Sequence, residues 1–282
     1  MNKLLGFVLL FLPFTILSQE ISVVTELDPY IQETSGLIQI NGKLITHNDS
    51  GGRPVLYEFD SSTGNVTREV FIKGAKNKDW EDICVDETHI YIADIGNNRG
   101  NRTDLRIYRI SKQDYLNNDE VTADTIQISY VDQKHFNLGK FKTNYDAEAL
   151  ISMGDSLYIF SKNWGNKNTR VYSLPKKLGP HALSPIAEFN AKCLVTAGEY
   201  VAENNEIVLC GYYFDKQYVI RITDIHLNNF QESKFITVPF KVPEDSSKQI
   251  EGLTWISGYE YYISAETYQN KPQVLYKMVW KP

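Results

Sequence analysis

The sequence predicts an all-β fold made of a repeated unit of short strands, and three observations lead to this prediction. Short apolar segments are separated by Gly, Asn and Asp turns along most of the chain. The aromatic residues that strands favour are abundant, with 18 Tyr and 13 Phe. One group of motifs also returns at intervals of 40 residues or more, which is typical of repeat architectures.

The first residues have the layout of a secretory signal peptide. Lys3 precedes an apolar run over residues 4–17, and the polar junction Ser18-Gln19-Glu20 follows. The run is too short to span a bilayer comfortably, although an uncleaved membrane anchor is the alternative. We therefore predict a signal peptide over residues 1–18 and one secreted or periplasmic domain over residues 19–282, with no stable membrane insertion after cleavage.

The first repeat unit begins at Glu33, which opens a strand. The turn Asn41-Gly42 leads into a second strand at residues 44–48, because Asn-Gly between apolar runs is a strong hairpin signal. Further strands are expected at Val55–Phe59 and, after the turn 61–64, at residues 68–72. The unit thus has four short strands linked by turns.

The same order of strands returns four more times. The second unit opens at Asp79, with strands at 90–93, 105–108 and 125–128; the third opens at Asp146, with 157–160, 170–172 and 186–189; the fourth opens near Thr196, with 207–209, 218–221 and 235–238; the last opens at Glu251, with 261–263 and 274–276. If Ser35, Glu81, Glu148, Gly198 and Glu251 are equivalent, the steps are 46, 67, 50 and 53 residues.

Four-stranded units at this spacing are typical of the blades of a β-propeller. The last unit has three strands, and residues 21–25 can supply its fourth, which would close the ring and protect its edges. We favour five blades. The 67-residue step also leaves room for a sixth, degenerate blade between Lys112 and Thr143, where a short helix at 112–118 and a loop over 134–144 are otherwise expected.

Carboxylates recur at the start of the predicted inner strands, which line the central channel of a propeller. Residues i and i+2 of a strand point the same way, so the pairs Glu33/Ser35, Asp79/Glu81 and Asp146/Glu148, with Glu251, converge on one channel mouth. Loops after the second strands rise on the same face and add Asn48, Asp49, Asp94, Asn97, Asn98, Asn163 and Glu266.

Crowded carboxylates raise each other's pKa and need a neutralising partner. Oxygen-rich sites suit Ca²⁺, whereas the absence of a His or Cys cluster argues against zinc or copper; His47 is the one histidine near this mouth. The candidate metal ligands are Glu81, Asp94, Glu148, Glu251, Asp79 and Asp146. Two alternatives remain: the carboxylates cap backbone N–H groups of adjacent blades, or they form a metal-free catalytic pair.

The loops that follow the second strands are rich in Gly, Asn and Arg. Arg53, Arg99 and Arg102 could bind an anion, although turns use the same residue types for their conformation alone. Trp80 and Trp164 could stack on a sugar ring or simply pack between blades. The candidate ligand-binding residues are Asp49, Arg53, Asn97, Asn98, Arg99, Asn163 and Glu266.

The composition limits the partners. The net charge of −6 argues against nucleic acid and anionic membranes and fits cationic ligands or metal ions. Among the three cysteines, Cys193 and Cys210 are the nearer pair, and they either form a disulfide or stay free in buried strands like Cys84. The partner is then an unidentified small molecule, glycan or protein.

Several motifs taken together resemble those of secreted bacterial propeller proteins, and more distantly the calcium-dependent phosphotriesterase-like propellers that include gluconolactonases and paraoxonases. The motifs are SGL at Ser35, NDSGG at Asn48, DWEDI at Asp79, DIGNN at Asp94 and EGL at Glu251. The resemblance implies a calcium ion in the channel mouth, with Glu81, Asp94, Glu148 and Glu251 as the matching ligands. The chain departs from paraoxonases in lacking an evident pair of catalytic histidines.

Two classes of function follow. The first is a binding propeller whose acidic face presents a site for a ligand or protein, and we favour it because no second catalytic group is evident. The second is a cation-dependent hydrolase of phosphoesters, lactones or glycosides, with Asp79 or Asp146 as the general base. A deep mouth with carboxyl groups of raised pKa would favour the hydrolase, and a shallow, plugged one the binding module.

Overall fold

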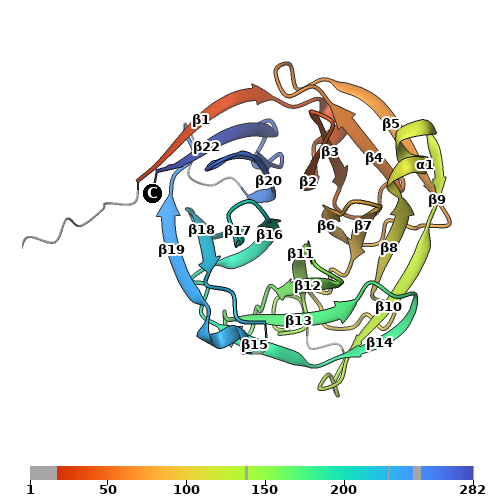
Figure 1. Ribbon diagram of the computed structural model, residues 1–282, viewed down its shortest axis with the longest axis vertical. Coiled ribbons are helices and arrows are strands. Elements are labelled where there is room, and N and C mark those ends of the chain that lie inside the picture. The colour runs from red at the N-terminus through yellow and green to blue at the C-terminus, as the bar shows by residue number, and fades with distance from the viewer. Residues whose placement is uncertain (1–17, 137–138, 228, 244–248, 282) are drawn as a thin grey trace, which may run out of the picture.

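Five β-sheets stand around one central axis in the computed structural model, which describes residues 18–136, 139–227, 229–243 and 249–281 (Figure 1). Each sheet contains a blade of four antiparallel strands, two sheets have a fifth, parallel strand, and the first strand of each blade lies nearest the axis (Figure 1). The predicted five-bladed propeller is therefore confirmed. The predicted signal peptide lies outside the described residues, except for Ser18, which begins the first strand.

The blades follow one another in chain order. Blade I contains β2 (Thr34–Ile40), β3 (Lys43–Asn48), β4 (Val55–Phe59) and β5 (Val66–Lys73). Blade II contains β6 (Trp80–Val85), β7 (His89–Asp94), β8 (Arg106–Ser111) and β10 (Asp124–Tyr130). Blade III contains β11 (Ala147–Met153), β12 (Ser156–Ser161), β13 (Thr169–Pro175) and β15 (Pro185–Phe189).

The remaining two blades complete the ring. Blade IV contains β16 (Leu194–Val201), β17 (Glu206–Tyr213), β18 (Lys216–Thr223) and β19 (Lys234–Phe240). Blade V contains β20 (Ile250–Ser257), β21 (Glu260–Ala265), β22 (Val274–Lys281) and β1 (Ser18–Glu26). Two short 3₁₀ turns lie between strands, η1 (Pro29–Ile31) and η2 (Phe230–Glu232).

The long step between the second and third units holds no sixth blade. It contains the predicted short helix, α1 (Lys112–Asn117), and the short strand β9 (Glu120–Thr122). β9 pairs in parallel with β5 at the outer edge of blade I, and β14 (Gly179–Leu183) pairs in parallel with β10 at the outer edge of blade II. Both fifth strands were missed by the sequence analysis, and they cover edges that would otherwise be exposed.

The N-terminal strand closes the ring as predicted. β1 pairs antiparallel with β22 along its length, so the two ends of the described chain lie side by side (Figure 1). Ile21 packs against the apolar cluster between blades IV and V, and Val24 packs against the cluster between blades V and I. Five such clusters fill the five spaces between neighbouring blades, so every blade depends on its two neighbours for burial.

All five inner strands are irregular at the same place, near the mouth. In four of them one residue bulges out of the pairing with the second strand: Glu81, Glu148, Thr196 and Glu251. β2 has a comparable shift after Ser35. The equivalent residue of blade IV is thus Thr196, two positions before the predicted Gly198. A bulge turns a side chain away from the regular alternation, and here it places the residue toward the axis.

The residue after each bulge packs inner strands together. It is small in four blades, namely Gly36, Ala149, Ala197 and Gly252, and it is Asp82 in blade II. The Asp82 carboxylate is fully buried and accepts backbone N–H bonds from Ile83 at 2.8 Å, Leu150 at 2.9 Å and Gly198 at 3.2 Å. One side chain therefore ties blades II, III and IV together at the axis.

Deleting residues 19–26 should lower the melting temperature by far more than removal of a flexible tail would. The deletion removes the fourth strand of blade V and leaves β22 as an unpaired edge. Differential scanning calorimetry measures the change, and about 2–4 °C corresponds to each kcal/mol lost in a domain of this size. A truncated chain that melts within about 2 °C of the intact domain would contradict the closure.

Asp82→Asn should destabilise the whole domain. An amide offers one acceptor oxygen, so at least one of the three buried N–H donors loses its partner, at about 1–3 kcal/mol for each. Urea unfolding measures the loss, with the exposed Asp215→Asn as the matched control. If the two variants unfold at the same urea concentration, the interblade role of Asp82 is wrong.

Candidate functional site

The upper ends of the inner strands surround a cavity of about 300 Å³ on the propeller axis. All five blades contribute to its wall. The lining residues are Ser35, Asp49, Ser50, Asp79, Glu81, Asn98, Lys140, Phe141, Asp146, Glu148, Lys162, Trp164, Tyr212, Gln249, Glu251 and Glu266. We call this space the mouth cavity; it holds seven carboxyl groups and two lysines.

Eleven of the sixteen lining residues come from three equivalent positions that recur in the blades. Two positions lie on the inner strand, the bulge residue and the residue two places before it, as the sequence predicts for Asp79 and Glu81. The third position lies at the end of the second strand. The backbone N–H of the residue there donates a hydrogen bond to the inner strand, as Asp49 does to Glu33 and Lys162 does to Asp146. The residues at this third position are Asp49, Gly96, Lys162, Tyr212 and Glu266.

Asp49, Asp79 and Glu81 form a compact oxygen cluster. One carboxylate oxygen from each lies within 4.8 Å of the others. The Oδ1 atom of Asp49 is buried and has no hydrogen-bond partner among the described residues. Gly96 makes room for the cluster, because a Cβ atom there would lie 1.9 Å from Glu81 Oε1. Such a set of hard oxygen donors is the kind that Ca²⁺ takes.

Lys162 is the main residue that the sequence analysis missed. Its ammonium group is buried, lies 2.6 Å from the Glu148 carboxylate and donates to the Tyr212 hydroxyl at 3.3 Å. Burial lowers the pKa of Lys162, but the charges of Glu148 and its neighbours outweigh this and hold the pKa above its usual value. Glu148, predicted as a metal ligand, is therefore already neutralised by a cation that belongs to the chain.

A chain of hydrogen bonds continues from Lys162 across the mouth. The Tyr212 hydroxyl donates to Gln249 Oε1 at 2.9 Å, and the Gln249 amide donates to Glu266. Tyr212 and Gln249 were also absent from the predicted site. Alignment of the second-strand ends would have placed Lys162 and Tyr212 beside Asp49 and Glu266, so the signal was present in the repeat.

Asp146 is fixed by its neighbours. The indole N–H of Trp164 donates to it at 2.6 Å, and the backbone N–H of Asn97 donates at 2.5 Å. Asp146 thus connects blades II and III at the rim while still facing the cavity. Trp164 lines the mouth cavity, whereas Trp80 is buried and packs edge-on against His47 at 5.4 Å.

Burial and mutual repulsion raise the pKa values of the carboxyl groups. Burial, then Asp79 and Glu251, raise the pKa of Asp49 to about 8. Burial and the charge of Asp146 raise the pKa of Asp79 to about 6. Glu251 reaches a pKa of about 8 and Glu266 one of about 7, mainly through burial, and the pKa of Glu81 also lies well above its usual value. The acidic groups of the mouth therefore favour a bound cation or bound protons.

The structure brings together eight of the predicted site residues. Those that line the mouth cavity are Asp49, Asp79, Glu81, Asn98, Asp146, Glu148, Glu251 and Glu266. Those that lie elsewhere are Asp94, Arg53, Asn97, Arg99 and Asn163. Arg53 pairs with Glu69 at 3.0 Å, and Asn163 accepts from Ser161 and donates to Asn166 within its own turn.

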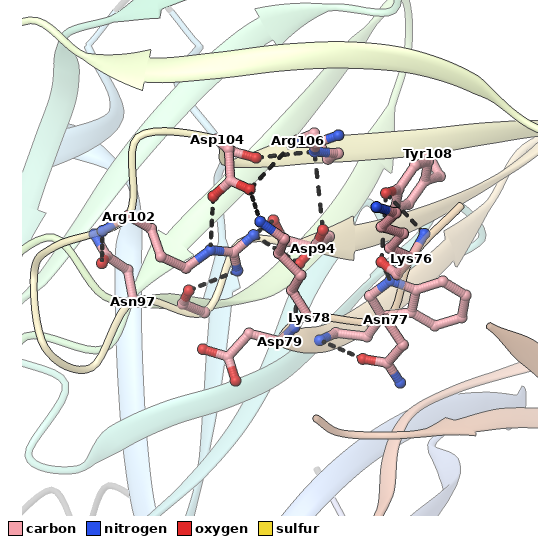
Figure 2. Close-up of polar contacts among 12 residues, drawn as sticks. Lys76, Asn77, Lys78, Asp79, Asp94, Asn97, Arg102, Asp104, Arg106 and Tyr108 are labelled. Atoms are coloured by element: carbon pink, nitrogen blue, oxygen red, sulfur yellow. Dashed lines mark hydrogen bonds and ion pairs between the residues drawn. The ribbon is translucent and has the colours of Figure 1, made fainter. Parts of the chain in front are cut away.

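Asp94 is not among the residues that line the mouth cavity, and Arg102 holds it (Figure 2). Its Oδ1 atom accepts from Arg102 at 2.8 Å and from the backbone N–H of Asp79 at 3.2 Å. Arg102 also contacts Asp104, which in turn pairs with Arg106 and Lys78. Asp94 therefore supports the main chain of Asp79 instead of joining the oxygen cluster, and Arg102 is engaged by this network.

The structure also shows where the interblade cap, the cysteines and Glu33 lie. Asp82, which was not a candidate, performs the interblade capping considered for the mouth carboxylates. Cys84, Cys193 and Cys210 are buried and unbridged. Glu33 is exposed and lies outside the cavity lining. No helix in the described part of the chain is long and apolar enough to cross a membrane.

Comparisons with known proteins identify the fold. No protein-family model matches the chain, and no curated protein matches it. Among solved structures, the PQQ-bound aldose sugar dehydrogenase of Streptomyces coelicolor is similar with a TM-score of 0.56 and 11% identity, covering 94% of this chain and 99% of that one. A glucose dehydrogenase is similar with a TM-score of 0.50 and 7% identity, covering 92% and 98%. At these identities the likeness concerns the propeller fold alone.

In the presence of EDTA, the melting temperature should fall as the pH rises from about 5 to about 8.5. Folding raises the pKa of Asp49 to about 8 and that of Asp79 to about 6, so the protonated groups stabilise the fold and this contribution is lost as the pH passes through those values. Added Ca²⁺ should restore stability most at the upper end of this range, because it binds the deprotonated groups. An equal calcium shift at both ends would contradict the linkage.

Proposed function

We propose that the mouth cavity is the centre of a divalent-cation-dependent hydrolase acting on an electrically neutral ester, lactone or glycoside. The observation that supports this most is the cluster of Asp49, Asp79 and Glu81 oxygens within 4.8 Å of one another, in the same cavity as the buried Lys162 ammonium. The sequence alone favours a binding module because it reveals no second catalytic group. Lys162 and Glu266 would supply such groups, and the mouth cavity is lined by carboxyl groups of raised pKa.

The oxygen cluster fits a hard cation. Asp49, Asp79 and Glu81 would hold it, and the unpartnered Asp49 Oδ1 is the atom whose burial most needs such a partner. Glu251 lies close enough to raise the pKa of Asp49, so it adds negative charge to the same region. Ca²⁺ is the best candidate, because carboxylate oxygens are its usual ligands and the cluster contains no His or Cys. A bound ion would polarise the reacting oxygen of a substrate.

Lys162 can stabilise negative charge that develops on a substrate. Two of its contacts, with Glu148 and Tyr212, hold the ammonium in place, and an ammonium has three N–H donors. In a largely buried site a fixed donor of this kind contributes strongly to transition-state stabilisation. Trp164, whose ring lies 5.4 Å from the ammonium, limits its movement further.

Glu266 is the proposed proton acceptor. Burial and the charge of Asp49 raise its pKa to about 7, near the value at which a general base is most effective at neutral pH. The hydrogen bond from Gln249 orients its carboxylate, and Gln249 is itself oriented by Tyr212. Lys162 and Glu266 are therefore positioned by one continuous chain of contacts.

The charge of the cavity distinguishes among substrates. Seven carboxyl groups face two lysines, so a doubly charged phosphomonoester meets repulsion that a neutral lactone, ester or glycoside avoids. The proposal also places the protein outside the cytoplasm, because Lys3 and the apolar run at 4–17 have the layout of a signal peptide.

A ligand-binding role without turnover is the second candidate function. The hydrogen bond from Trp164 to Asp146 and the ion pair of Lys162 with Glu148 favour it, because they hold these two carboxylates in place.

Isothermal titration calorimetry should detect Ca²⁺ binding that Glu81→Gln abolishes, since the amide keeps the shape and loses the charge. The exposed Glu203→Gln is the matched control and should bind Ca²⁺ like the unaltered protein. At 100-fold excess over Kd, Ca²⁺ should stabilise the fold by about 2.7 kcal/mol. Mg²⁺ should stabilise it less, because it requires a tighter octahedron. If the protein binds no Ca²⁺ at neutral pH, the proposed cation centre is wrong.

Turnover should require the cation and Glu266. We expect Ca²⁺-dependent hydrolysis of p-nitrophenyl acetate, a six-membered lactone or a p-nitrophenyl glycoside, and little of p-nitrophenyl phosphate. Glu266→Gln should lower kcat by about 10²–10⁴, the usual range for a lost general base, while leaving the fold intact. If Ca²⁺ binds and none of these neutral substrates is hydrolysed, the binding module is the correct function.

A further inference from the structure

One side of the mouth cavity is an aromatic wall made of Phe141 and Trp164. Their ring centroids lie 4.3 Å apart with the planes tilted by 45°. Phe141 is 45% exposed, although a large apolar side chain gains by burial. Except for the ring of Tyr212, the rest of the cavity lining is charged or polar. The cavity is therefore amphipathic, because it combines two aromatic rings with many hydrogen-bonding groups.

The aromatic wall is held rigidly. The Trp164 indole donates to Asp146, and its backbone N–H donates to Thr143 at 2.9 Å. The backbone N–H of Phe141 bonds to Asn98 in the neighbouring blade at 2.8 Å. Phe141 has a φ of 62°, a conformation that bulky residues rarely adopt and that the surrounding contacts must enforce. Backbone strain of this kind is concentrated at binding and active sites.

We propose that the aromatic wall binds the C–H face of a single sugar ring, either free or at the end of a glycan chain. A sugar ring has the same two-sided chemistry as the cavity. Its C–H face packs on aromatic rings, its hydroxyl groups donate to carboxylates such as Asp146 and Glu251, and its oxygens accept from Lys162. A cavity of about 300 Å³ has room for one such ring and little more.

Two other ligand classes fit the cavity less well. An organic cation would use the aromatic faces, but Lys140 already lies 4.6 Å from the Phe141 ring, and Lys167 and Lys162 lie 5.2 and 5.4 Å from the Trp164 ring. A wholly apolar ligand would displace water from the carboxyl groups without replacing their hydrogen bonds. The sugar site lies in the same mouth cavity as the proposed hydrolase centre. It rests on that proposed function only for the position of the cation.

The test is calorimetric titration of the intact mature domain with methyl glycosides of common hexoses and pentoses, in Ca²⁺. At least one glycoside should bind saturably, and Phe141→Ala should weaken that binding about tenfold or more through loss of ring contact. Phe136→Ala is the matched control, because Phe136 is 48% exposed on the same loop but does not line the cavity. Binding that Phe136→Ala alone weakens would overturn the assignment.

Two further measurements distinguish a free sugar from the end of a glycan chain, and a sugar from an organic cation. A trisaccharide that binds more tightly than its terminal methyl glycoside would place the ring at the end of a chain, and equal binding would place it free in the cavity. No binding by any glycoside, or binding of choline that Phe141→Ala abolishes in its place, would overturn the proposal. Phe141→Ala should still bind Ca²⁺, so loss of glycoside binding is distinguishable from failure of the cation centre.

Discussion

The irregularity near the top of each inner strand determines where the functional side chains of this propeller lie. A regular strand would alternate its side chains between the two faces of a blade, and both faces are packed against neighbouring blades. The bulge in four blades instead turns one residue toward the axis, and three of these residues are glutamates: Glu81, Glu148 and Glu251. The residue that follows the bulge lies where neighbouring inner strands meet. This position explains why the residue is small in four blades and why Asp82 can cap backbone N–H groups of other blades. The acidic mouth and the stability of the ring are thus consequences of one backbone feature.

Concentrating seven carboxyl groups in one cavity requires compensation, and the chain supplies only part of it. Lys162 neutralises Glu148, and backbone and indole N–H groups stabilise Asp146. Among the described residues, no ion pair joins Asp49, Asp79 or Glu81 to an ammonium group, and burial raises the pKa values of all three. The two parts of the mouth therefore differ: one contains the ammonium group of Lys162, and the other contains carboxyl groups whose pKa values are raised.

Much of the fold could be predicted because it depends on local patterns that repeat. The strand order, the closing role of residues 21–25 and the convergence of Asp79, Glu81, Asp146, Glu148 and Glu251 all follow from strand periodicity and turn residues. β9 and β14 could not be found in this way, because each is a short segment whose pairing partner lies in the preceding blade. Asp94 was misplaced because the sequence does not reveal that Arg102 lies beside it. Lys162 was missed because a search for acidic groups disregards a lysine at an equivalent position.

The equivalent position at the end of the second strand shows how a symmetric ring acquires an asymmetric site. Its five residues are an aspartate, a glycine, a lysine, a tyrosine and a glutamate, each with the same backbone placement and a different chemical task. Asp49 adds an oxygen to the cluster, and Gly96 leaves the space that Glu81 fills. Lys162, Tyr212 and Glu266 come from blades III, IV and V, and hydrogen bonds join them through Gln249. The inner strands contribute carboxyl groups to the mouth cavity in three of the five blades. In the proposed function, the identity of this second-strand residue decides whether a blade contributes a cation ligand, a counter-ion or a proton acceptor.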